Sequence, residues 1–210
     1  MMNAKGQGWT QAPLTKGDKA GLIGFCIAGA AIAVWVTVFC VQRIIELSRG
    51  TDVPVLVEFT GTEVQAPLTS GGGSVALGLD RATLTAASLP PIATVPGIIG
   101  QVIQILTIVV VIACLILLAQ STLRGRIFSR RNTALVMTAG LTGLVGFAAV
   151  RFFDNMLANA AVNVVTDNAI DNAVITVEPF TFILAAFIIS VIGTAFVIGD
   201  KLQRETEGLV

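Results

Sequence analysis

Two arginine–acid pairs are the side chains best placed to interact chemically. Arg43 stands three residues before Glu46, directly after a long apolar segment. Arg151 stands three residues before Asp154, directly after another. Residues at this spacing share one face of a helix, so one interpretation is two local pairs in the interfacial region, each contributing well under about 1 kcal/mol. The alternative is that each arginine faces the acid of the other segment, so that the pairs set the register of two helices.

Side chains for catalysis or metal binding are sparse. The chain has no histidine, so Ser-His and Cys-His catalysis are excluded, and its three cysteines lie within apolar runs as small hydrophobic residues. The acids Asp167, Asp171 and Glu178 do not form an Asp-x-Asp-x-Asp calcium loop. We therefore expect no enzyme activity, no catalytic residue, no metal site and no cofactor. The net charge of zero argues against a nucleic-acid partner.

A third group of chemically capable side chains lies at 121–133, which contains four arginines and no acid. Arginines beside a membrane attract anionic lipid head groups at roughly 1 kcal/mol each, and they favour the cytoplasmic side. We interpret them as topology and lipid anchors, with docking of an acidic cytosolic partner as the alternative. These residues are Arg124, Arg126, Arg130 and Arg131.

The elements that carry these side chains are predicted from hydropathy. The chain is 54% hydrophobic and 12% charged, whereas about a quarter of the residues of a soluble domain are charged. We predict a mostly α membrane protein whose transmembrane helices each cross about 30 Å of hydrocarbon. The first apolar run is longer than the roughly 7 to 15 residues of a cleaved signal peptide, so we expect it to be retained. The four helices are predicted at 20–42, 97–120, 134–150 and 180–199.

The distribution of charge predicts the orientation. With 1–19, 121–133 and 200–210 inside, the inner segments carry nine Lys or Arg residues and four acids. The outer segments, 43–96 and 151–179, then carry four Lys or Arg residues and nine acids. This bias predicts a multi-pass protein of the bacterial cell membrane with both termini in the cytoplasm.

The outer segments predict a small extracytoplasmic β-rich domain. Val53, Val55, Val57 and Phe59 alternate with other residues, as in a strand with one buried face. Turns are expected at 71–73 and at Asp80-Arg81, and a helical period covers 155–166. Strand candidates are 53–60, 74–79 and 82–89 in the first outer segment and 173–177 in the second.

Small and polar side chains within the helices indicate how the helices pack. Gln101, Gln104 and Thr107 recur every three residues, which indicates a face toward another helix or, alternatively, a substrate path. The third helix is rich in small residues, which favour close packing within the chain or, alternatively, dimerisation. The small residues that we assign to packing are Ala139, Gly143 and Gly146.

The connector and the tail resemble those of a bacterial family. Leu123 to Asn132, Leu-Arg-Gly-Arg-Ile-Phe-Ser-Arg-Arg-Asn, is similar to the Gly-x-x-Phe-Ser-x-x-Asn connector of a family of small four-span membrane proteins of unknown function. Gly199 to Val210 resembles the tail of its actinobacterial members, and the likeness covers 97–210. Members are often encoded beside a small helix-turn-helix regulator, so the resemblance implies a sensing or regulatory role. It implies no catalytic or binding residues.

These observations together predict a non-enzymatic sensing, regulatory or interaction protein. Its expected partners are the lipid bilayer and either a protein partner or further copies of the chain. The alternative is an accessory subunit of a larger transport or respiratory complex, or a small carrier. The carrier is disfavoured because none of the four apolar segments contains an ionisable residue at its midpoint.

Overall fold

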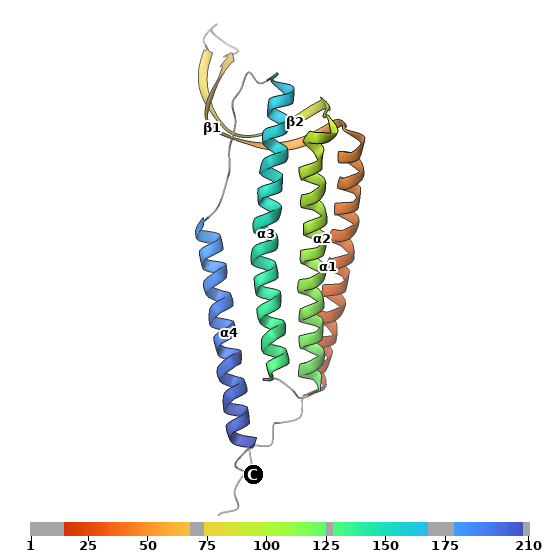
Figure 1. Cartoon of the computed structure of the whole chain (residues 1–210), viewed down its shortest axis with the longest axis vertical. Coiled ribbons are helices and arrows are strands. Elements are labelled where there is room, and N and C mark those ends of the chain that lie inside the picture. The colour runs from red at the N-terminus through yellow and green to blue at the C-terminus, as the bar shows by residue number, and fades with distance from the viewer. Residues whose placement is uncertain (1–14, 68–73, 125–127, 168–178, 208–210) are drawn as a thin grey trace, which may run out of the picture.

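The computed structural model describes residues 15–67, 74–124, 128–167 and 179–207. These residues form four long helices and a two-stranded antiparallel sheet (Figure 1). The helices are long and apolar enough to cross a membrane, which confirms the prediction of four such helices and supports a multi-pass membrane protein. The elements are α1 Lys16–Arg49, β1 Thr51–Pro67, β2 Ser74–Ser88, α2 Pro91–Leu123, α3 Arg130–Val165 and α4 Pro179–Glu207.

The helices extend beyond the predicted apolar segments because their ends carry good capping residues. Thr15 and Asp18 form a reciprocal capping box at the start of α1, and Ser129 Oγ accepts a hydrogen bond from Asn132 N at the start of α3. The helix α3 extends beyond the predicted transmembrane span 134–150 and includes most of the following segment with a helical period. The helix α2 begins before the predicted span 97–120, because Pro91 occupies its first position, where a missing N–H is harmless.

The four helices lie side by side in chain order, as a row (Figure 1). Among the described helices and strands, α4 packs against α3 alone, and Phe196 of α4 also contacts the ring of Phe128 in the connector. We call the end of the row that carries the sheet the sheet end, and the end at which residues 124–129 join α2 to α3 the connector end. The last turn of α4 lies at the connector end (Figure 1).

Small residues lie where neighbouring helices approach each other. Gly146 of α3 packs so closely on α2 that an added Cβ would lie 2.0 Å from Thr107 Oγ1. At Gly143 the nearest atom, Val111 Cγ2, would be 3.9 Å away, so this position has more room. Ala139 is also buried. The Thr107 end of the polar stripe therefore faces α3, as expected for helix packing.

The sheet has one buried face, made by the alternating residues that the sequence identifies. Val53, Val55, Val57 and Phe59 are buried and form one apolar cluster with residues of α1, α2 and α3. The partners from α3 are Leu157, Ala158, Ala161 and Val162.

The strands are longer than predicted, and the expected turn at Asp80-Arg81 is wrong. Residues 74–88 form one strand, because Arg81 pairs with Glu58 of β1 and the ladder continues on both sides of an irregularity between Glu58 and Thr62. The expected turn at 71–73 and the expected strand at 173–177 lie outside the described residues.

The hairpin begins and ends at the same point. Gly50 ends α1 in the left-handed conformation, with φ of 65°, which a glycine adopts without strain. Leu89, directly after β2, donates its backbone N–H to Gly50 O at 2.7 Å. A Cβ at position 50 would lie 2.8 Å from Leu89 O, so a larger residue would not fit.

Candidate functional site

A cavity of about 200 Å³ lies at the sheet end, where the sheet meets the helices. Four elements, α1, α2, α3 and β1, contribute its walls. We call it the junction cavity. Its polar lining residues are Arg43, Glu58, Gln101, Arg151, Asp154 and Asn155.

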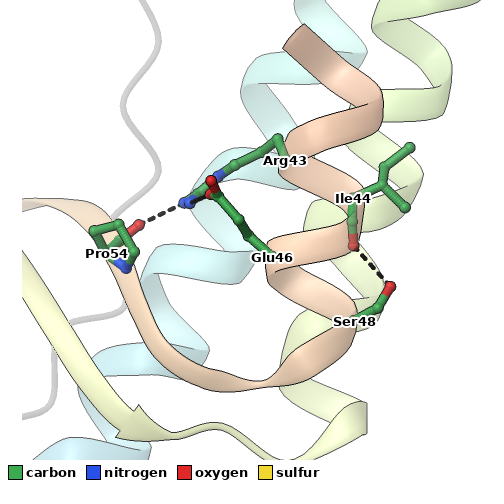
Figure 2. Close-up of polar contacts among 5 residues, drawn as sticks. All are labelled: Arg43, Ile44, Glu46, Ser48 and Pro54. Atoms are coloured by element: carbon green, nitrogen blue, oxygen red, sulfur yellow. Dashed lines mark hydrogen bonds and ion pairs between the residues drawn. The ribbon is translucent and has the colours of Figure 1, made fainter. Parts of the chain in front are cut away.

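Arg43 joins α1 to the first strand. Its Nη1 donates to Glu46 Oε2 at 2.9 Å, and its Nη2 donates to the carbonyl oxygen of Pro54 (Figure 2). One turn further, Ser48 Oγ donates to Ile44 O at 2.7 Å within α1. The bond from Arg43 to Pro54 holds the last turns of α1 beside the start of β1. Arg43 thus makes a local ion pair and a tertiary hydrogen bond at once.

Glu58 joins the sheet to α3. Its Oε1 lies 2.9 Å from Arg151 Nη2 and also contacts Arg81 Nη2 of β2. The Glu58 side chain is only 13% exposed, whereas Arg81 is 59% exposed. A single carboxylate therefore connects both strands with the third helix, and its burial makes these contacts stronger than those of a solvent-exposed pair.

Two further acceptors line the cavity without a donor. Asp154 lies within electrostatic range of Arg151 and Arg43, yet its carboxylate makes no hydrogen bond or salt bridge among the described residues. Gln101 is 9% exposed, and its Oε1 accepts no hydrogen bond from any described residue. A buried acceptor such as Gln101 Oε1 is nearly always satisfied, by protein, water or a ligand, and the half-buried Asp154 carboxylate lies beside the same space. These two groups are therefore available to a molecule inside the cavity.

Neither interpretation of the two arginine–acid pairs describes the site fully. Arg43 and Glu46 form the local pair, while Arg151 pairs with Glu58 and not with Asp154. Among the described residues, no salt bridge joins Arg43 to Asp154 or Arg151 to Glu46. The interaction that the sequence did not predict joins residues 93 positions apart. One signal could have identified it, since Glu58 is the one acid between Val53 and Phe59, where apolar residues alternate.

The remaining predicted residues occupy different places. Gln104 is half-buried on α2 and does not line the junction cavity. At the connector end, Arg124 and Arg131 line a second cavity of about 160 Å³ together with Ser121 and Ser129. Arg130 is exposed, and Arg126 lies outside the described residues.

The junction cavity has the composition of a binding site for a small polar molecule. It offers cationic donors and anionic acceptors from separate elements, all within a partly enclosed space. Among the residues that the structure describes, no group of three or more Cys, Asp or Glu side chains could hold a metal ion. Comparison of the chain with protein-family models, with curated proteins and with solved structures finds no match.

Proposed function

We propose that this protein is a non-enzymatic, multi-pass protein of the bacterial cell membrane that senses conditions at the outer surface. The observation that carries the proposal is the junction cavity, in which Glu58 of the sheet is shared between Arg81 of β2 and Arg151 of α3. A molecule that binds there, or a partner that moves the hairpin, changes the contacts of Arg151. Because α3 continues from Arg151 to the connector end, it links the cavity to that end of the row.

Charge supports the orientation in this proposal. The connector end carries arginines without neighbouring acids in the connector, and the positive-inside rule assigns such loops to the cytoplasm. The sheet end then faces outward, with its acids and arginines in mixed clusters. Both chain ends are cytoplasmic in this arrangement, because the four helices cross the membrane an even number of times.

Cysteine labelling on intact cells tests the orientation. In a background with Cys26, Cys40 and Cys114 replaced by alanine, we compare Thr85→Cys, on an exposed position of β2, with Arg130→Cys, at the connector end. A membrane-impermeant maleimide should label position 85 on intact cells and position 130 only after permeabilisation. Labelling of position 130 on intact cells would contradict the proposed orientation.

Native purification tests the sensing function against the accessory-subunit alternative. The full chain is extracted from its source membrane in a mild detergent, and its mass is measured by light scattering with the detergent contribution subtracted. A single chain or a homo-oligomer supports a sensor that works through its own cavity. A stable assembly with several other chains supports the accessory-subunit function and contradicts our proposal.

A further inference from the structure

We propose that the junction cavity binds a small zwitterion that carries both an ammonium and a carboxylate group, of the size of a small amino acid. This inference rests on the proposed function, because the ligand must reach the sheet end from the outer solution. It names the class of molecule that the sensor recognises.

The ammonium group is inferred from the acceptors. Gln101 Oε1 is buried without a donor, and the Asp154 carboxylate has neither a hydrogen bond nor a salt bridge among the described residues. An ammonium group has three N–H donors, so one such group can satisfy an amide oxygen and a carboxylate together. A buried acceptor that stays unsatisfied costs about 1–3 kcal/mol, which gives the cavity a reason to hold a donor.

The carboxylate group is inferred from the donors. A guanidinium has five N–H donors, of which Arg43 uses two among the described residues, for Glu46 and Pro54. Arg151 uses one of its Nη donors for Glu58. The unused N–H groups of the two arginines can hold a carboxylate, in the charge-assisted geometry that arginine favours.

The charge balance of the cavity excludes a ligand of a single sign. Two arginines, Arg43 and Arg151, line the same space as two acids, Glu58 and Asp154. An anion such as phosphate would lie near both carboxylates, and a simple amine would lie near both guanidinium groups. A zwitterion places each of its charges beside the opposite one and leaves the total charge of the site unchanged.

The size and the apolar part of the lining fit the same class. A cavity of about 200 Å³ has room for only a few water molecules, since each occupies about 30 Å³ in the liquid. Leu47, Val55 and Leu157 contribute apolar wall beside the polar groups. The space therefore suits a short side chain next to the two charged groups, and it is too small for a peptide.

Calorimetric titration of the purified full chain in nanodiscs tests the inference. The probes are glycine, L-alanine and L-serine, with propionate and ethylamine as compounds that each carry only one of the two charges. We expect saturable binding of at least one amino acid, at least tenfold tighter than that of either control. Equal binding of propionate or ethylamine overturns the zwitterion, and so does the absence of saturable binding of all three amino acids at millimolar concentration.

Two variants locate the ligand. Gln101→Leu removes the buried acceptor, and Asp154→Asn removes the charge while keeping the shape. Each should weaken amino-acid binding about tenfold, which corresponds to about 1.4 kcal/mol. Gln104→Leu is the matched control, since Gln104 lies on the same helix outside the cavity, and it should bind as the unaltered protein does. Unchanged binding in both cavity variants would overturn the assignment of the site, and either variant alone suffices if the other does not fold.

The failure of this inference can be told apart from the failure of the proposed function. Titration in nanodiscs exposes both faces of the protein, so it reports on the cavity whatever the orientation in the cell. Labelling of Thr85→Cys and Arg130→Cys reports on the orientation without any ligand. Amino-acid binding with reversed labelling would reject outer-surface sensing and keep the binding site, whereas correct labelling without binding would reject the zwitterion alone.

Discussion

The two ends of the helix row use charge differently. At the sheet end, the carboxylate of Glu58, which is 13% exposed, forms ion pairs with two other elements, beside the local pair of Arg43 and Glu46. At the connector end, the ion pairs of α4 are local, four residues apart and exposed on at least one side: Asp200 with Arg204, and Lys201 with Glu205. Such surface pairs contribute about 0–1 kcal/mol.

The difference separates a binding region from an anchoring region. Charges that converge from separate elements around a cavity can recognise a molecule, because the fold fixes their relative positions. Arginines at a membrane boundary need no fixed positions to attract anionic head groups. The comparison therefore predicts that changes at the sheet end affect stability more than changes at the connector end.

The largest effect is expected from a charge in the buried face of the sheet. Val57 is fully buried in the cluster between sheet and helices, so Val57→Asp should destabilise the protein by about 3 kcal/mol or more. Leu77→Asp is the control, because Leu77 on β2 is 52% exposed, and it should change little. Thermal unfolding in detergent measures both. Equal losses in the two variants would mean that the sheet end is not a packed unit.

A smaller effect is expected in the middle of the row, where α2 and α3 connect the two ends. Gly146→Ala forces Thr107 to move and should destabilise the protein by about 1–3 kcal/mol. Gly143→Ala meets only ordinary contact with Val111, so it should be neutral or stabilise by up to about 1 kcal/mol. The free energy of unfolding, measured from unfolding curves, should be lower for Gly146→Ala than for Gly143→Ala. The reverse order would contradict the close packing of α2 on α3.

The contribution of the tertiary ion pairs can be separated from that of a local one. Glu58→Gln removes the charge that Arg81 and Arg151 share, and it should cost about 1–2 kcal/mol. Glu46→Gln removes the local partner of Arg43, which is 56% exposed, and it should cost less than about 0.5 kcal/mol. Denaturant titration would reject the contrast between tertiary and local pairs if both variants lost the same free energy.

The smallest effect is expected at the connector end, and it depends on the lipid. Arg131→Gln should reduce stabilisation by anionic phosphatidylglycerol by roughly 1 kcal/mol, since it removes one cation from the second cavity. Arg204→Gln is the control, because Arg204 pairs with Asp200 at 3.0 Å. Melting temperatures with and without the anionic lipid measure the difference. If the anionic lipid raised the melting temperature of Arg131→Gln as much as that of the unaltered protein, the result would contradict an anchoring role for Arg131.

Sequence patterns predicted the elements whose signals are local. Four apolar runs are long enough to identify helices, and the alternation from Val53 to Phe59 identifies the buried face of a strand. The close packing at Gly146 follows from the same kind of signal, since a small residue in an apolar helix favours a neighbouring helix. These properties depend on spacing along the chain, which the sequence displays directly.

The features that could not be predicted depend on distant partners. Asp80 has low preference for strands, but the neighbouring Arg81 gains a partner in Glu58 of the other strand and the strand continues. The junction cavity requires that Arg43, Gln101 and Asp154 come from three helices at one level of the row. No local sequence pattern shows that these three residues lie at the same height along the helices, because that height depends on how far each helix extends past its apolar segment.

The contact between Gly50 and Leu89 has a consequence for the architecture as a whole. Because the chain leaves α1 and returns to α2 at one place, the 38 residues from Thr51 to Ser88 form a cassette inserted between two helices whose ends already meet. Replacing the cassette with a short turn would leave those ends within bridging distance. The closure at Gly50 and Leu89 therefore leaves the far end of the hairpin open to changes in length, whereas the buried face from Val53 to Phe59 must keep its fit to α1, α2 and α3.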